Sequence, residues 1–311
     1  MTGGAGFIGS HLVETLVRRK EKVRVLDNLS TGSLRNLSHI RGKFDYQQGD
    51  IRDQHDVRQA LKGVTYVLHE AALRSVARSV EDPVTSNDVN VNGTVTLLWE
   101  SLRARVKRVV YASSSSVYGE SKKFPQSTLQ PAHPVSPYAV SKYAAEQYCR
   151  VFSETLGLST VSLRYFNVFG PRQDPLSKYA VVIPIFMHAA YWKKALPLDG
   201  DGRQSRDFAY IENVVWATLA AAMRPGVSGD VFNVACGQTH SLNDYIRILE
   251  KLAGRKMKIV HRKVRVGDVK KTWADISKTK KMLGYRPLFD FEGGIRKTWD
   301  YFSHSQKGMG S

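Results

Sequence analysis

The first 170 residues of the chain alternate between short apolar runs and longer segments with helical periodicity. Apolar and β-branched residues predict strands at residues 22–26, 44–47, 65–69, 108–113 and 160–165. Apolar positions that recur every three or four residues predict helices at residues 9–19, 55–61, 84–102 and 136–156. Several of these strands are apolar nearly throughout, as parallel strands covered on both faces are. The alternation therefore predicts an α/β fold built on a doubly wound parallel sheet.

The pattern loosens after Gly170 and Pro171. Shorter segments predict helices at residues 182–192, 212–223, 242–252 and 291–302, and a strand at residues 231–234. We expect residues 1–170 to form the sheet domain and residues 171–311 to form mainly a smaller α/β region, with some segments returning to the sheet. Open α/β sheets bind ligands at the carboxyl edge of their strands, so we expect the smaller region to cover that edge.

Composition narrows the class of protein. The 311 residues are 42% hydrophobic and 24% charged, which excludes wholesale disorder. No apolar run approaches the ~20 residues that a membrane-spanning helix needs, and the opening residues show no secretory signal. The two cysteines exclude a disulfide scaffold and a four-thiolate zinc site. We expect a cytoplasmic protein with no metal site and no membrane partner.

The charge is strongly positive, with a formal net value of +18. Basic residues gather between Lys251 and Lys281. Such a stretch suits nucleic acid, an acidic membrane surface or a small polyanion such as a nucleotide diphosphate. A solvated basic face gives the same pattern. Composition leaves these alternatives open.

The chain opens with a glycine-rich segment that contains Gly3, Gly6 and Gly9. Glycines at this spacing allow a tight turn, a close approach of the backbone to a pyrophosphate, and close packing of helix on strand. Asp27 ends the next predicted strand, where an acid accepts hydrogen bonds from ribose hydroxyls and repels a 2′-phosphate. Glycines alone are equally typical of a flexible turn. Together with the strand and Asp27 they predict a Rossmann-like domain that binds NAD rather than NADP.

The strand that should precede this glycine-rich loop is not visible, because the sequence begins at the loop itself. That strand is central in a doubly wound sheet, so we expect its two neighbours to remain unpaired. We interpret the opening as a late or truncated start, and we expect reduced stability and NAD affinity from it.

Tyr138 and Lys142 are four residues apart on a predicted helix, and therefore on one face of it. A tyrosine ionises near pH ~10, but a lysine cation and an oxidised nicotinamide ring nearby favour its phenolate form. Such a tyrosine acts as a general base near neutral pH. The same spacing also occurs by chance in surface pairs. A run of serines that includes Ser114 and Ser115 ends another predicted strand and places hydroxyls where ligands bind.

The glycines, the serine run and the Tyr-x-x-x-Lys pair occur in the order found in the extended short-chain dehydrogenase/reductase family. Within that family the chain resembles the UDP-hexose 4-epimerases, particularly the UDP-N-acetylglucosamine 4-epimerase group, over essentially its whole length. The resemblance implies that Tyr138 takes the sugar O4 proton while C4 gives its hydride to NAD. Ser114 would bind O4 with Ser115 assisting, and Lys142 would hold the cofactor ribose and depress the pKa of Tyr138.

The same resemblance implies the remaining binding residues. Those expected at the cofactor are Gly3, Gly6, Phe7, Ile8, Gly9, Asp27, Asn28, Asp50, Ile51, Ala71, Ala72, Asn90, Tyr138, Lys142 and Tyr165. Those expected at a UDP-sugar substrate are Ser114, Asn167, Val182, Arg206, Arg265, Asp268 and Thr272. The arginines would grip the diphosphate, since a guanidinium binds phosphate oxygens bidentately. Core packing is the alternative for Tyr165.

Two sequence features indicate which UDP-sugar is the substrate and which reaction it undergoes. Ser115 and Ser116 stand where the family's 4,6-dehydratases carry an acidic pair, so dehydration is not expected. Thr272 stands where glucose-restricted epimerases often carry tyrosine, and the smaller side chain leaves room for a 2-acetamido group. We expect interconversion of UDP-GlcNAc and UDP-GalNAc, with UDP-Glc and UDP-Gal also accepted. The alternatives are a UDP-glucuronate 4-epimerase or another nucleotide-sugar enzyme of the family.

A non-catalytic NAD- or RNA-binding protein is the alternative from a different class, and the basic stretch motivates it. No recognition motif for nucleic acid accompanies that stretch, so no nucleic-acid partner is expected. The resemblance also implies a homodimer, formed by a four-helix interface of the helices predicted at 84–102 and 136–156.

Overall fold

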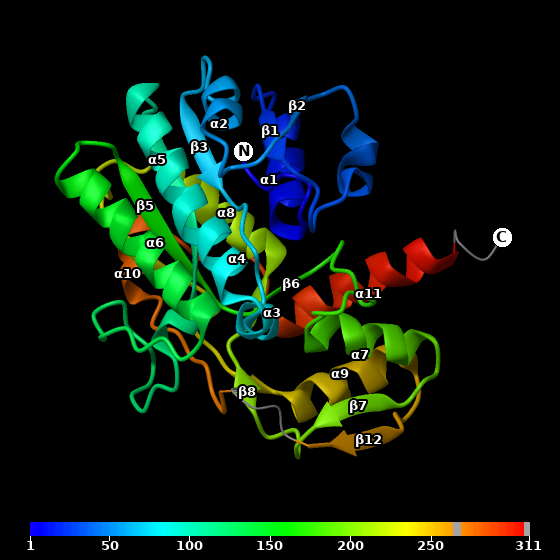
Figure 1. The fold of residues 1–311 in the computed structure, drawn as a ribbon. Helices are drawn as coiled ribbons and strands as arrows, with labels where there is room; N and C mark the ends of the chain where they lie inside the picture. The colour runs from blue at the N-terminus through cyan, green and yellow to red at the C-terminus, as the bar shows by residue number, and fades with distance from the viewer. Residues whose placement is uncertain (264–268, 308–311) are drawn as a thin grey trace.

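A parallel sheet runs through the centre of the protein in the computed structural model, which describes residues 1–263 and 269–307 (Figure 1). Its strands are β1 (Arg24–Asp27), β2 (Asp45–Gln48), β3 (Tyr66–His69), β4 (Arg108–Ser114), β5 (Thr160–Tyr165) and β10 (Val231–Val234). β2 pairs with β1, and β3, β4, β5 and β10 follow one another in that order, every pair being parallel. The predicted doubly wound, Rossmann-like sheet is confirmed.

Met1, Thr2 and Gly3 lie between β1 and β3 and connect the two halves of the sheet. Thr2 forms parallel bridges with both Leu26 and His69. The Leu26 amide donates to the Met1 carbonyl, and the Gly3 amide donates to the Leu26 carbonyl. The Thr2 hydroxyl lies 2.7 Å from Nδ1 of His69. The expectation that the two neighbouring strands are unpaired is therefore wrong over this stretch, because the backbone of Met1 and Thr2, just before the glycine turn, pairs with both strands.

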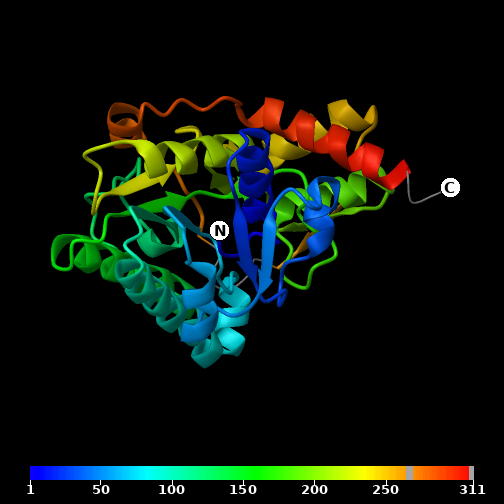
Figure 2. The same cartoon turned by 90° about the horizontal axis from the view of Figure 1, so that it is seen from above.

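Helices cover both faces of the sheet (Figure 2). α1 (Phe7–Arg18) and α8 (Ile211–Met223) pack on one face, and α2 (Gln54–Ala60), α5 (Gly93–Arg103) and α6 (Pro137–Glu154) pack on the other. The sequence explains where α6 begins, since the Ser136 hydroxyl accepts from the Ala139 amide and Pro137 occupies the first turn.

The helix predicted at residues 84–102 is divided in the structure. α4 (Pro83–Asn87) begins at Pro83 with Asp82 as its cap, a wider π-type turn covers Asp88–Asn92, and α5 follows from Gly93. α3 (Val76–Glu81) precedes them. A Cβ atom at Gly93 would lie 2.7 Å from Ile51, so the glycine allows this segment to pack closely on the loop after β2.

The later residues build a second region beside the carboxyl ends of the strands (Figure 1). It contains α7 (Val182–Tyr191), α9 (Leu242–Ala253) and α11 (Phe291–Lys307). Its short strand pairs are β6 (Val168–Phe169) with β9 (Ala209–Tyr210), β7 (Leu196–Asp199) with β12 (Ile259–Arg262), and β8 (Ser205–Arg206) with β11 (His240–Ser241). β10, α8 and α10 (Ser277–Leu283) return to the sheet and pack against one another there.

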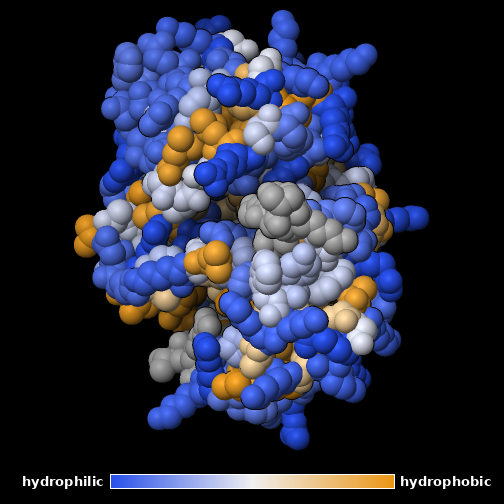
Figure 3. Space-filling view, turned by 90° about the vertical axis from the view of Figure 1, so that its right-hand side faces the viewer, coloured by the Kyte–Doolittle hydropathy of each residue, from blue (hydrophilic) through white to orange (hydrophobic). Residues whose placement is uncertain are grey.

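The surface is mainly hydrophilic on the face drawn in Figure 3, with scattered apolar patches, in keeping with the net charge of +18. Among the described helices, none combines the length and apolar character needed to cross a membrane.

Candidate functional site

A cleft of about 1140 Å³ lies between the carboxyl ends of the strands and the second region. Nearly all the residues expected to bind ligands line it. They are Gly3, Gly6, Phe7, Ile8, Gly9, Asp27, Asn28, Asp50, Ile51, Ala71, Ala72, Ser114, Ser115, Tyr138, Lys142, Tyr165, Asn167, Val182, Arg206 and Thr272. Residues from both ends of the chain therefore face one common space.

The glycine-rich loop leaves no room for side chains. A Cβ atom at Gly9 would lie 2.1 Å from the carbonyl oxygen of Gly3, and one at Gly3 would lie 2.6 Å from the Ala71 nitrogen. Gly3 also has a φ of +66°, which favours glycine. α1 begins at Phe7 after Gly6, and no side chain caps its first amides. Those N–H groups and the positive end of the helix dipole form a site for a phosphate.

Carboxyl and amide groups stand at the ends of β1 and β2. The two oxygens of Asp27 accept from the amides of Ala5 and Leu29, at 2.9 and 2.8 Å, so its carboxylate holds the glycine-rich loop in place. Each oxygen retains a second lone pair for a ligand hydroxyl. Asn28 donates to Asp50 at 2.9 Å, and a hydrogen bond from Arg52 lowers the pKa of Asp50 to about 2.

Asn90 is the exception among the described residues, because it does not line the cleft. It is buried behind the loop that follows β3, where its side chain accepts from the Leu73 amide and donates to the Leu73 carbonyl, at 2.8 and 3.1 Å. It also donates to the Ser141 hydroxyl at 3.0 Å. Asn90 therefore holds the loop that follows β3 against α6, and its side chain does not contact the cleft.

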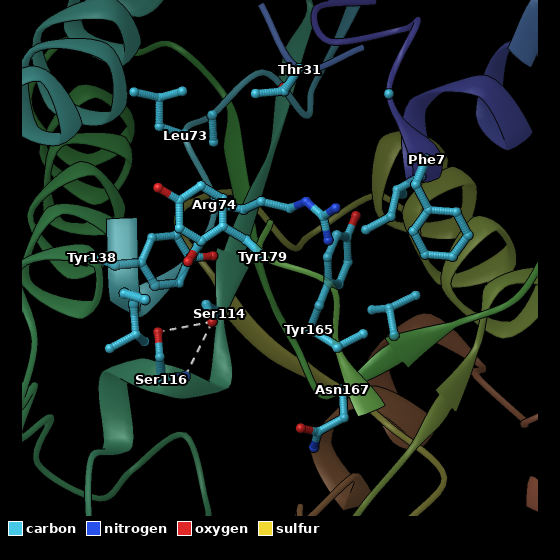
Figure 4. Close-up of a pocket in the computed structure, with 18 of the residues that line it drawn as sticks. Phe7, Thr31, Leu73, Arg74, Ser114, Ser116, Tyr138, Tyr165, Asn167 and Tyr179 are labelled. Carbon is cyan, nitrogen blue, oxygen red and sulfur yellow. Dashed lines mark hydrogen bonds between the residues drawn. The ribbon is translucent and has the colours of Figure 1, made fainter. Parts of the chain in front are cut away.

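Ser114 and Tyr138 meet at the end of β4 (Figure 4). α6 presents Tyr138, whose amide donates to the Ser79 hydroxyl at 3.0 Å. Ser114 accepts from the Ser116 amide and hydroxyl, at 3.1 and 2.9 Å, which fixes its oxygen. The nearby hydroxyl of Ser114 lowers the pKa of Tyr138, as a group that can donate to the phenolate should.

The pKa of Tyr138 is nevertheless raised above its ordinary value, because burial disfavours the phenolate. Ser114 and the guanidinium of Arg74 lower it, and Glu70 raises it. Lys142 is not among the groups that shift this pKa here, and its expected effect on Tyr138 stays a prediction. The Lys142 ammonium lies over the Tyr111 ring, 4.8 Å from its centroid, and burial lowers the pKa of Lys142 to about 8.

Two cleft residues that the sequence did not single out act on these groups. The Tyr165 hydroxyl donates to Oε1 of Glu70 at 2.8 Å. Burial raises the pKa of Glu70 to about 7, while the Tyr165 bond and the Lys142 charge lower it. Arg74 extends between Tyr138 and Tyr165 in the view of Figure 4. No sequence signal distinguishes Arg74 from the many other basic residues, whereas Glu70 directly precedes Ala71 and Ala72, which are expected at the cofactor.

The second region supplies the other wall of the cleft. Both amide protons of Asn167 are used, one by the Asp207 carbonyl at 2.8 Å and one by the Thr272 hydroxyl at 2.9 Å. Arg206 donates to the carbonyls of Ser205 and Lys270, and Val182 begins α7. Arg265 and Asp268, also expected at the substrate, lie outside the described residues.

The chain matches the model of the NAD dependent epimerase/dehydratase family over residues 1–235. It belongs to this family. A putative UDP-glucose 4-epimerase of Methanocaldococcus jannaschii is 36% identical over 309 residues, which cover 99% of each chain. A UDP-glucuronate 4-epimerase of Thermodesulfobacterium geofontis is also 36% identical, over 96% of this chain and 94% of that protein.

Solved epimerase structures superpose on nearly the whole chain. The UDP-N-acetylglucosamine 4-epimerase of Methanobrevibacter ruminantium, solved with UDP-N-acetylmuramic acid, has 38% identity and a TM-score of 0.93, covering 98% of this chain and 97% of that one. The UDP-glucose 4-epimerase of Thermus thermophilus, solved with NAD, has 36% identity and a TM-score of 0.88, covering 97% of each chain.

The cofactor of the epimerase/dehydratase family fits the residues on this chain. The turn in which Cβ atoms at Gly3 and Gly9 would collide with backbone leaves space for a pyrophosphate above the uncapped start of α1. Asp27 lines the cleft at the end of β1, where an acidic residue would accept hydrogen bonds from the ribose hydroxyls of the cofactor. The predictions of the family, of an NAD-dependent isomerase and of NAD as its cofactor are confirmed.

Proposed function

We propose that this protein is a UDP-hexose 4-epimerase that interconverts UDP-GlcNAc and UDP-GalNAc and also accepts UDP-Glc and UDP-Gal. The observation that carries the proposal is that Ser114 lies close enough to Tyr138 to lower its pKa, with both residues lining the cleft that Gly3 and Gly9 open for NAD. A phenol beside a hydroxyl group is suited to exchange a proton with a sugar hydroxyl.

Each catalytic residue has one task in this mechanism. NAD, held by the glycine-rich loop and Asp27, would supply reversible hydride transfer at the sugar C4. Tyr138 takes the O4 proton as the hydride leaves and gives it back at the end. Ser114 donates to the O4 atom or to the phenolate and so orients both, with Ser115 beside it. Arg74 and, once the ribose is bound, Lys142 supply positive charge that favours the phenolate.

The substrate side of the cleft supports a UDP-sugar. Arg206 lines the wall, where its guanidinium suits a diphosphate. Val182 would pack beside the uracil. Both amide protons of Asn167 are used within the protein, so its Oδ1 atom would accept from a hydroxyl of the sugar. Arg265 and Asp268 complete the proposed set from outside the described residues.

Thr272 supports the choice of an N-acetylated sugar. It is 6% exposed, lines the cleft and accepts from Asn167, so its side chain is fixed at the wall. A tyrosine there would project into the cleft and take the volume that a 2-acetamido group needs. Pocket volume discriminates by ~1–3 kcal/mol, about 10- to 200-fold.

A panel of UDP-sugars tests the proposal. Wild-type protein loaded with NAD should epimerise UDP-GlcNAc and UDP-Glc, and Thr272→Tyr should lose at least tenfold in kcat/KM for UDP-GlcNAc while retaining UDP-Glc turnover. The same selectivity in both proteins would contradict the role of Thr272. Absence of turnover with every sugar would favour a non-catalytic NAD- or RNA-binding protein.

A UDP-glucuronate 4-epimerase is the second candidate, favoured by the guanidinium of Arg74 in the cleft. Arg74 is close enough to Tyr138 to lower its pKa, so it also lies close to the sugar ring in this mechanism. A uronate carboxylate would pair with that cation. Turnover of UDP-glucuronate above that of UDP-GlcNAc, abolished in Arg74→Ala, would select this reading.

We also infer a homodimer formed through α4, α5 and α6, in the cytoplasm. Val84 on α4 is 77% exposed and Val140 on α6 is 51% exposed, and Tyr148 and Val151 extend the same apolar surface. The free thiols of Cys149 and Cys236 suit a reducing compartment. Light scattering should show a dimer for wild type and a monomer for Val140→Lys combined with Val151→Lys, and a dimer in both would place the interface elsewhere.

A further inference from the structure

Glu70 is a carboxyl group in the cleft for which the mechanism above has no use. It follows β3 directly and lines the cleft together with Tyr138, Lys142 and Tyr165. Burial raises its pKa to about 7, so its charge changes close to neutral pH. A buried group that titrates there has a function more often than a surface group does.

The hydrogen bonds around Glu70 can form whether its carboxyl group is ionised or protonated. The Tyr165 hydroxyl is 2.8 Å from Oε1 of Glu70 and 2.8 Å from Oγ1 of Thr218, and Thr218 donates to the Val214 carbonyl at 2.8 Å. Two hydroxyl protons thus serve three contacts. When Glu70 is ionised, Tyr165 donates to it and one contact lacks a proton. When Glu70 is protonated it can donate to Tyr165, and all three contacts are satisfied.

Several ionisable groups feel the charge of Glu70. Lys142 faces it from α6 and lowers its pKa, and Tyr165 faces it from β5. The charge of Glu70 in turn raises the pKa values of Tyr138 on α6 and Tyr111 on β4. The resemblance to the epimerases implies that the nicotinamide would lie beside Tyr165 and Tyr138, and therefore near this carboxyl group. An oxidised nicotinamide ring is a cation and a reduced one is neutral.

We propose that Glu70 is a redox-coupled proton site, ionised while the bound NAD is oxidised and protonated when it is reduced. The ionised carboxylate stabilises the cationic ring over the neutral one and so holds the cofactor in the form that starts each cycle. The proton taken up on reduction comes from solvent and returns there on reoxidation. The hydride and the O4 proton of the sugar balance without it. The inference rests on the proposed function only in requiring the nicotinamide beside Tyr165.

Binding measurements on the full chain test this inference without turnover. The dissociation constants of NAD+ and NADH are measured between pH 5.5 and pH 8 by NADH fluorescence and competition. In wild type the ratio Kd(NADH)/Kd(NAD+) should rise about tenfold over this range. For a two-electron couple, this rise lowers the reduction potential of the bound cofactor by ~30 mV. In Glu70→Gln the ratio should match wild type at pH 5.5 and lie about tenfold below it at pH 8.

Two comparisons separate electrostatics from structural damage. Glu292→Gln removes an exposed carboxylate that pairs with Arg296 on α11, and it should follow wild type at every pH. Lys142, Tyr138 and Tyr111 are present in all three proteins. Their titration therefore cancels when the Kd ratio of Glu70→Gln is compared with that of wild type at the same pH. Damage to the fold by Glu70→Gln would change the ratio at both ends of the range or weaken both ligands equally.

The wild-type series can overturn the proposal even if Glu70→Gln fails to fold. A wild-type ratio that is constant from pH 5.5 to pH 8, in a protein that epimerises UDP-sugars, would overturn the role of Glu70 and leave the proposed function intact. Failure of wild type to bind either form of the cofactor would overturn both.

Discussion

The buried pair of Glu146 and Arg164 gives the sharpest prediction about stability. Glu146 on α6 is 1% exposed and Arg164 on β5 is 4% exposed. Arg164 donates to the two carboxylate oxygens at 2.6 and 3.0 Å, and the Ser113 hydroxyl donates to one of them at 2.7 Å. The carboxylate therefore connects α6 to two adjacent strands, directly beneath Ser114.

Glu146→Gln keeps the shape of the side chain and removes its charge. Arg164 then remains a buried cation beside a neutral amide, which costs about 3–5 kcal/mol when one member of a buried pair is lost. Domains unfold with a free energy of about 5–15 kcal/mol, so the loss is a large part of the total. Urea unfolding followed by tryptophan fluorescence measures the free energy of unfolding directly.

A surface pair on the same helix provides the control. Glu154 is 55% exposed and pairs with Arg150 at 2.7 Å, so Glu154→Gln should change the free energy of unfolding by at most about 0.5 kcal/mol. Removing both buried charges, in Glu146→Leu with Arg164→Met, should cost less than the two single changes together. A cost below about 1 kcal/mol for Glu146→Gln would contradict this prediction and would mean that Arg164 finds water or another partner.

Two further predictions concern the cofactor and the pH profile. Gly9→Ala places a methyl group 2.1 Å from the Gly3 carbonyl oxygen, so the loop must open and NAD affinity should fall at least tenfold by calorimetry; unchanged affinity would show that the phosphate lies elsewhere. Burial lowers the pKa of Lys142 to about 8, so if its positive charge is required, kcat/KM should fall as pH rises through about 8. Lys142→Arg keeps its charge to higher pH, and its decline should move upward by at least one pH unit; an identical decline in both proteins would assign the limb to another group.

The sheet could be predicted from sequence because its strands are local, nearly continuous apolar runs. β1 to β5 and β10 are all found within two residues of their predicted bounds. The strands that were missed have a different character. β6, β8, β9 and β11 are two residues long and exist only through pairing with distant segments. β7 contains Pro197 and pairs with β12, some sixty residues later, so no local pattern marks it.

The candidate site also has one part that local sequence predicts and one part that depends on tertiary packing. Gly3, Asp27, Ser114 and Tyr138 belong to motifs with fixed spacing, and the structure brings all of them to one cleft. The spacing of residues in the sequence could not show which cation acts on the pKa of Tyr138. Tyr138 and Lys142 share a helix face, yet the lysine lies on the Tyr111 ring. The cation that acts on Tyr138 is Arg74, from a loop whose path depends on packing against Asn90.

Turnover by Tyr138→Phe shows whether the Tyr138 hydroxyl carries the O4 proton, because the change removes that hydroxyl and leaves the ring. The variant, loaded with NAD, should bind UDP-sugar as wild type does and should lose between about 10²- and 10⁴-fold in kcat for C4 epimerisation. A kcat within threefold of wild type would show that another group carries the O4 proton and would contradict the proposed role of Tyr138.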